Sequence, residues 1–238
     1  MTSKINIMIA IITYNAPHRK TQDLLAQLMF KGYHDVMVLA IPFVQRKNFQ
    51  PLFKHRPGKA VDVSLDDICI RLGISCVHTP VEELADQVAH FKPEHTLIAG
   101  AGILPEELAK NHRVINAHPG YLPYTKGLDA FKWAIFHGQP IGVTTHYISE
   151  KADEGLLIDR KKVPVYFEDT FHSVAYRQYE MEIEMLTEAI TLTEGSLPKE
   201  SLSDDRYVAN RRMPHHLELK MMQRFKILVE SSPSIKEP

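Results

Sequence analysis

The apolar run at residues 5–12 restricts the fold more than any other stretch of the chain. It is rich in isoleucine and almost uninterrupted, which is typical of a strand covered on both faces within a parallel sheet. A helical pattern follows at residues 19–31, and residues 36–41 form a second apolar run of strand length. This strand–helix–strand order predicts an α/β fold, namely a Rossmann-like, mostly parallel sheet with helices on both faces.

The same alternation continues to about residue 194, so residues 1–194 are predicted to form one domain. Residues 195–238 are polar and turn-rich apart from a helical pattern near 214–229, and are predicted to be a short C-terminal extension. Further strands are expected at residues 74–78, 96–99, 114–118, 141–149 and 156–165, and further helices at 64–73, 81–91, 130–136 and 169–193.

Composition and missing signals exclude several classes of protein. The formal net charge of -1 gives no electrostatic footprint for nucleic acid, and the turn at residues 13–17 lacks the glycines of a dinucleotide-binding loop. Cys69 and Cys76 supply neither a disulfide framework nor a metal-binding quartet. We find no signal peptide and no apolar run of membrane-spanning length. A cytoplasmic protein without metal, nucleic acid or membrane is expected.

The strand at residues 114–118 ends in a pair of polar side chains. Asn116 and His118 are two positions apart, so they project from the same strand face, and Pro119 and Gly120 end the strand immediately after them. Ligands of open α/β sheets bind at such carboxyl ends. A backbone cap and a packed histidine would explain the pair equally well. What favours a site is Asp153, in the loop after the strand predicted at residues 141–149.

These residues form a pattern that resembles one enzyme family. Asn-x-His-Pro-Gly at residues 116–120 is followed by Leu122-Pro123, Gly127, Gly-Val-Thr-x-His at 142–146 and Asp-x-Gly at 153–155. Their order and spacing resemble the formyltransferases that use 10-formyltetrahydrofolate. The resemblance implies a formyltransferase catalytic domain at residues 1–194, a folate co-substrate and no metal. It also implies that the catalytic residues are Asn116, His118 and Asp153.

The chemistry of formyl transfer suits these three side chains. An uncharged amide such as Asn116 can donate a hydrogen bond to a developing oxyanion. His118 can hold and move a proton near neutral pH, and a carboxylate at Asp153 would stabilise its imidazolium. The folate itself is expected against the turn after residue 98 and the loop before Asp153. The residues implied for it are Ile98, Gly100, Gly102, Ile103, Leu104, Ser149, Glu150 and Ala152.

Within the family, the motifs at residues 118–124 and 142–146 most resemble the sugar-nucleotide N-formyltransferases. The glycine-free first turn disfavours the purine-pathway enzyme, and the chain is expected to be too short for the β-barrel of the initiator-tRNA enzyme. The chain is also expected to lack the N-terminal regulatory domain of the formyl-folate hydrolase, because its first predicted strand begins at residue 5. The expected acceptor is therefore a nucleotide-linked amino sugar for bacterial surface glycans, including those of the pseudaminic-acid type.

The acceptor site is expected near a basic stretch at residues 42–63, which could meet a diphosphate although a solvated loop explains most of its charges. Two alternatives stay open: a glycinamide ribonucleotide formyltransferase and a non-catalytic Rossmann-like binding protein. The partners are expected to be small molecules, and a homodimer is left open. The residues expected to bind the acceptor are Tyr14, Asn15, Lys47, Arg56, Tyr121, Tyr124, Lys126 and His146.

Overall fold

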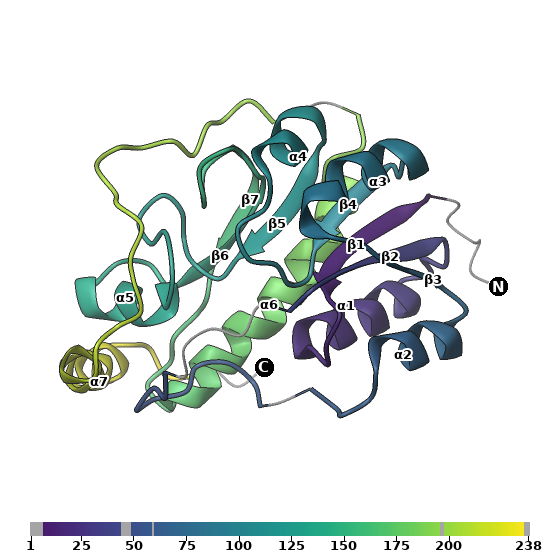
Figure 1. Ribbon diagram of the computed structural model, residues 1–238. Helices are drawn as coiled ribbons and strands as arrows, with labels where there is room; N and C mark the ends of the chain where they lie inside the picture. The colour runs from purple at the N-terminus through teal and green to yellow at the C-terminus, as the bar shows by residue number, and fades with distance from the viewer. Residues whose placement is uncertain (1–6, 44–48, 59, 196–197, 236–238) are drawn as a thin grey trace.

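The computed structural model describes residues 7–43, 49–58, 60–195 and 198–235. Its centre is a seven-stranded sheet in the order β3-β2-β1-β4-β5-β6-β7 (Figure 1). The first five strands along the chain run parallel, and β6 is antiparallel to both β5 and β7. The strands are β1 (Ile9–Tyr14), β2 (Val36–Ile41), β3 (Ser75–His78), β4 (His95–Ile98), β5 (Val114–His118), β6 (Gly142–Tyr147) and β7 (Leu156–Lys162).

Helices cover both faces of the sheet, as predicted. The helices are α1 (Arg19–Phe30), α2 (Leu65–Leu72), α3 (Leu84–Phe91) with a short 3-10 turn before it (Val81–Glu83), α4 (Glu106–Asn111), α5 (Ala130–His137), α6 (Phe171–Leu192) and α7 (His215–Glu230). Within the part of the chain that the structure describes, no helix is both long enough and apolar enough to span a bilayer.

The two faces of β1 pack against two different layers of helices. Ile9 and Ile11 point into a core that α1, α2 and α6 complete, whereas Ala10 and Ile12 point into a second core under α3 and α4. Because side chains alternate along a strand, a strand covered on both faces must be apolar at every position. The run of isoleucines is therefore the direct signature of this two-sided burial.

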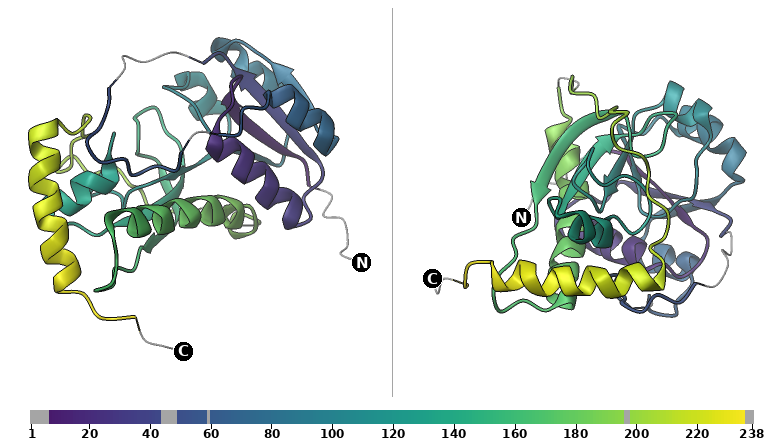
Figure 2. Two further views of the ribbon diagram at one scale, coloured as in Figure 1. Left: turned by 90° about the horizontal axis from the view of Figure 1, so that it is seen from below. Right: turned by 90° about the vertical axis from the view of Figure 1, so that its left-hand side faces the viewer.

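A third core lies at the end of the molecule where β6 and β7 are. It joins α5, the start of α6 and α7 through Phe131, Phe171, Met221 and Phe225. Figure 2 shows α7 along the edge of the molecule. The expected extension therefore packs its helix onto the predicted domain, and the domain division itself stays a prediction.

The observed elements differ from the expected ones mainly at their ends. β1 continues through Thr13 and Tyr14, which we had placed in a turn, because both pair with β2 up to Tyr14↔Ile41. Helix α4 was not predicted, since three of its six residues are charged and exposed to solvent and only Leu108 is buried. The capping predicted at Asp169-Thr170 is confirmed, with Thr170 accepting from the Ser173 amide at 3.1 Å.

Candidate active site

The tip of β5 presents Asn116 and His118 on the same face, as the strand period requires. Across the antiparallel pairing, Asn116 lies opposite His146 and His118 opposite Thr144. Below the tip, the buried Gln178 amide donates to the carbonyls of Pro119 (3.0 Å) and Gly142 (2.8 Å). The polar end of the strand is thus tied to α6 and held in place from the side of the core.

Asp153 reaches this strand tip from the loop between β6 and β7. Its Oδ1 lies 3.1 Å from His118 Nδ1, and its Oδ2 accepts from the Gly127 amide at 2.6 Å. The turn is tight: Asp153 has a φ of 56° and Gly155 a φ of 119°, and a Cβ on Gly155 would lie 2.0 Å from the Tyr147 carbonyl oxygen. Only glycine fits there, so the Asp-x-Gly motif is what allows the loop to return toward His118.

His118 is buried, and its other ring nitrogen, Nε2, donates to the Thr125 carbonyl at 2.7 Å. With a carbonyl on Nε2 and a carboxylate on Nδ1, both ring nitrogens carry protons, as in an imidazolium. Gly120 permits this arrangement, because a Cβ there would lie 2.7 Å from Nε2. For Nε2 to pass a proton to a ligand, it must first leave the Thr125 carbonyl.

The electrostatics favour the charged pair. Burial by itself lowers the pKa of His118, but the charge and hydrogen bond of Asp153 and the Thr125 carbonyl outweigh it, so the pKa is raised above 6.5. Burial would raise the pKa of Asp153, yet His118 and the Gly127 amide hold it below its usual 3.8. Both shifts favour an imidazolium–carboxylate pair over the neutral pair.

The pair has a defined pH window. The contribution of His118 is complete below its unfolded pKa and is lost as the pH rises through the raised folded pKa, while that of Asp153 is present above its unfolded pKa of about 4. We expect Asp153→Asn to lower the free energy of unfolding most near pH 6 and progressively less above the folded pKa of His118. Urea titrations from pH 5 to 9, with NMR of the His118 ring, measure both effects. A stability difference that does not vary with pH would contradict the pair.

Asn116 is oriented by a neutral histidine. His146 is buried, and burial together with the charge of His118 lowers its pKa to about 4. Its Nδ1 donates to the Tyr147 carbonyl at 3.1 Å, which leaves Nε2 as an acceptor 3.4 Å from Asn116 Nδ2. His146, which was expected to bind the acceptor, therefore also orients Asn116, since it fixes which side of the Asn116 amide carries the donors.

A buried charge cluster next to the tip was missed by the sequence reasoning. Glu182 on α6 is only 1% exposed and binds Lys20 (2.8 Å) and Arg56, while Lys20 also donates to the Ala117 carbonyl at 3.4 Å. Burial would raise the pKa of Glu182, but these two cations lower it to about 2. One feature of the sequence could have revealed this cluster: the acidic residue Glu182 lies on the apolar face of α6, between Tyr179 and Ile183.

The residues expected to hold the folate lie on two neighbouring segments. Ile98, Ala101, Leu104 and Ile148 all pack on the core beneath α3 and α4, so the turn after β4 and the loop after β6 adjoin. Ile103, in the turn after β4, is 95% exposed. Gly100 has a reason of its own to be glycine, because a Cβ there would lie 2.6 Å from His18 Cε1.

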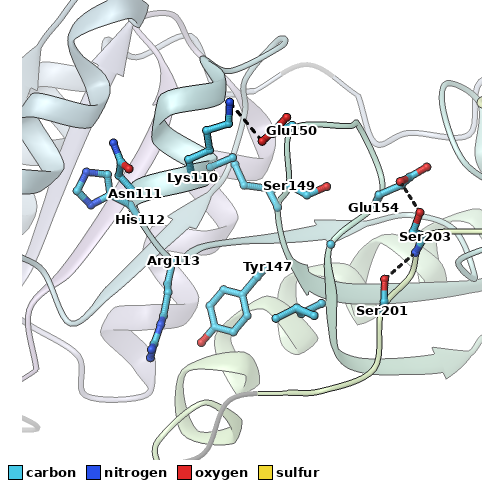
Figure 3. A pocket seen from close by; sticks show the side chains of 14 residues that line it. Lys110, Asn111, His112, Arg113, Tyr147, Ser149, Glu150, Glu154, Ser201 and Ser203 are labelled. Carbon is cyan, nitrogen blue, oxygen red and sulfur yellow. Dashed lines mark hydrogen bonds and ion pairs between the residues drawn. The ribbon is translucent and has the colours of Figure 1, made fainter.

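A cavity of about 560 Å³ opens beside these segments, but not at Asn116, His118 and Asp153. It lies between the end of α4 and the loop after β6, and Ser149 and Glu150 are the expected folate residues that line it (Figure 3). Its edge is closed by the ion pair between Glu150 and Lys110 at 3.3 Å. Asn116, His118 and Asp153 are not among its lining residues, so the cavity is not the proposed reaction centre.

The residues expected to bind the acceptor are more dispersed. Tyr14 meets Phe43 edge to face, and Asn15 accepts from the Phe43 amide at 3.1 Å. Lys126 is buried, with its ammonium bonded to Glu154 (2.9 Å) and to the Asp204 carbonyl (3.2 Å), so it links loops in this conformation.

The remaining aromatic residues expected at the acceptor form a cluster. Tyr121 stacks on Tyr124 with ring centroids 6.1 Å apart, and Tyr124 meets Tyr207 edge to face. Arg160 lies over the Tyr121 ring at 5.4 Å. Lys47 falls outside the described residues. Arg56 is 40% exposed despite its ion pair with Glu182.

A parallel sheet that turns antiparallel at β6, with the candidate residues Asn116 and His118 on β5 at this switch, defines a Rossmann-like class of fold. A family model described as formyl transferase matches residues 67–190, and the chain belongs to this family. The structure of a sugar N-formyltransferase from a Shewanella species has the same fold, with a TM-score of 0.57, 24% identity, and coverage of 90% of this chain and 87% of that one.

Curated relatives resemble the chain over shorter stretches. Methionyl-tRNA formyltransferase of Koribacter versatilis is 32% identical over 120 residues, 49% of this chain and 38% of the relative. The dTDP-4-amino-4,6-dideoxyglucose formyltransferase of Mycobacterium tuberculosis is 29% identical over 109 residues, 44% of this chain and 47% of the relative. The aligned part thus spans less than half the length of either relative.

Proposed function

We propose that the protein is an N-formyltransferase that moves the formyl group of 10-formyltetrahydrofolate to the amine of a nucleotide-linked amino sugar, for bacterial surface glycan synthesis. The observation that carries formyl transfer is the arrangement of Asn116, His118 and Asp153. In it, the ion pair between His118 and Asp153 lies beside the oriented amide of Asn116. Membership of the formyl transferase family supports the same chemistry.

Each side chain has one task in this reaction. When bound, the folate supplies a formyl group on a nitrogen that can leave as an amine. Asn116 donates through Nδ2 to the oxygen that becomes negative as the acceptor nitrogen adds to the formyl carbon. His118 gives its Nε2 proton to the departing nitrogen and then regains one from the acceptor nitrogen, so the net change is one proton passed from the acceptor nitrogen to the departing nitrogen. Asp153 stays ionised and stabilises the imidazolium.

The residues after β4 and β6 would fit the pterin ring of the folate. A flat ring system with an apolar surface suits the exposed side chain of Ile103, which otherwise has no burial to stabilise it. The segments carrying Leu104 and Ile148 pack on one core, so both can face a single ligand. Backbone groups of these segments would supply the hydrogen bonds.

Two observations support an amino-sugar nucleotide as acceptor: the positive charge near the strand tip and the similarity to a known formyltransferase. Lys20 and Arg56 share the single carboxylate of Glu182, which leaves a net charge of +1 (two cations minus one anion) next to the strand tip. A diphosphate would be attracted to that charge and to the exposed part of Arg56. Similarity to the dTDP-amino-sugar formyltransferase supports the same acceptor class.

An acceptor panel tests the proposal. We expect the purified protein to release tetrahydrofolate with one or more nucleotide-linked amino sugars and to yield a product heavier by one formyl group. Glycinamide ribonucleotide and methionyl-tRNA, offered under the same conditions, should give no turnover. Turnover with glycinamide ribonucleotide alone would leave formyl transfer intact and make the acceptor wrong. No turnover with any amine would favour the binding protein.

A further inference from the structure

Helix α2 and strand β3 bring together four side chains whose chemistry is that of a zinc site. Asp66 and Cys69 lie three residues apart on α2, so they share a helix face. Cys76 and His78 lie two residues apart on β3, so they share a strand face. Only two residues, Gly73 and Ile74, join the helix to the strand, and the Ile74 amide donates to the Cys69 carbonyl at 3.0 Å.

The donor atoms of this cluster are already close. Single ligand atoms of Asp66, Cys76 and His78 all lie within 4.8 Å of one another, and His78 Nε2 is 2.8 Å from Asp66 Oδ1. Cys69 lies next to Cys76, but its sulfur is not within 4.8 Å of all three of those ligand atoms. In a tetrahedral zinc site neighbouring ligands are roughly 3.3–3.8 Å apart, so shifts of about 1 Å would bring these three atoms into place, and a turn of the Cys69 side chain would supply the fourth donor.

We propose that Asp66, Cys69, Cys76 and His78 bind a divalent zinc ion that fastens α2 to β3. Two thiolates, an imidazole and a carboxylate form a donor set that selects zinc over the hard cations magnesium and calcium. Solvent reaches the site, since the side chains of His78 and Asp66 are 50% and 53% exposed. The cysteine spacing alone had predicted no metal quartet, because the other two donors come from a helix and a strand that only the fold places together.

The position of the site indicates a structural role. β3 is the outermost strand of the sheet, paired to β2 alone, and lies at the opposite end from β6 and β7 (Figure 1). Three strands separate it from β5, which is about 19 Å at the usual strand spacing. Beyond its ladder with β2, this edge is held mainly by α2. A metal linking helix and strand would stabilise it, and its binding is independent of the function proposed for the Asn116 strand.

Zinc binding by the reduced, metal-free protein tests the site. We expect one zinc per chain in competition with a chromophoric chelator, and a thiolate-to-cobalt charge-transfer band when cobalt replaces zinc. At a hundredfold excess of free zinc over Kd, the unfolding temperature should rise by roughly 5–10 °C. Cys76→Ser and His78→Ala should each weaken binding at least about 100-fold and abolish this rise, while Cys69→Ser should weaken the cobalt band.

The controls separate a metal site from a folding defect. His34→Ala removes another exposed histidine on the same half of the chain and should leave zinc affinity unchanged. Circular dichroism of Cys76→Ser and His78→Ala without metal should match the parent, because Cys76 is only partly buried and His78 is exposed. The proposal is wrong if the reduced protein shows no zinc affinity tighter than about 10 µM, or if Cys76→Ser and His78→Ala bind like the parent.

Discussion

Replacing His118 with alanine is expected to lower kcat for formyl transfer by about 10³-fold, within the range that a positioned acid–base group contributes. The reason is that, in the described part of the chain, the other two histidines near the strand tip are neutral. His146 is held neutral by burial, with its pKa lowered to about 4, and Nδ1 is committed to a carbonyl. His18, also lowered to about 4 by burial and by Lys20, is neutral as well.

Companion variants divide the roles at this site. Asn116→Ala should raise the barrier by about 3 kcal/mol through loss of an oxyanion donor, and Asp153→Asn should move the pH–rate profile, because the His118 pKa falls without the carboxylate. Calorimetry with a non-transferable folate analogue should show binding largely unchanged in all three. His172→Ala, a change to an exposed histidine on α6, is the matched control. Near-normal turnover by His118→Ala would overturn the mechanism.

The largest effect on stability is expected from a buried ion pair away from this site. Lys132 on α5 and Glu218 on α7 are both 0% exposed and bind each other, and Glu218 also accepts from the Leu52 amide at 2.8 Å. Lys132→Met should lower the free energy of unfolding by about 3–5 kcal/mol, because the Glu218 carboxylate stays buried without its cation.

Two further variants test this account. Adding Glu218→Leu to Lys132→Met removes the orphaned charge and should recover most of the loss, since an apolar pair of similar size often replaces a buried ion pair. Lys110→Met removes an exposed lysine that pairs with Glu106 and Glu150, and should cost less than about 1 kcal/mol. Urea unfolding monitored by Trp133 fluorescence measures all three. A loss with Lys132→Met no larger than with Lys110→Met would contradict the prediction.

The same pair shows how the C-terminal segment joins the fold. Glu218 on α7 contacts both α5 and the stretch between β2 and α2. The basic residues of that stretch had been interpreted as mostly solvated, yet Arg56 binds Glu182 and the His55 ring stacks on Phe131 with a centroid distance of 5.8 Å. Part of the stretch is thus anchored on α5 and α6, and the exposed part of Arg56 is what remains for a ligand.

The sequence alone determined the fold class through local patterns, and it supplied the catalytic candidates through the strand period together with the resemblance of the motifs to a family. Apolar runs report two-sided burial directly, and the period of two in β5 already places Asn116 and His118 on one face. Helix α6 and its cap at Thr170 were likewise readable from neighbouring residues. The Asp-x-Gly motif indicated the Asp153 loop before any contact was known.

Only the tertiary structure decided how distant residues pair. Glu182 with Lys20, Glu218 with Lys132, His146 with Asn116 and Cys76 with Asp66 all join separate elements. Their partners are chosen by which helix packs against which strand, and that choice depends on the whole core. A polar residue in an apolar pattern signals that a buried partner must exist, because an unpaired buried charge is too costly. The pattern cannot say which residue it is.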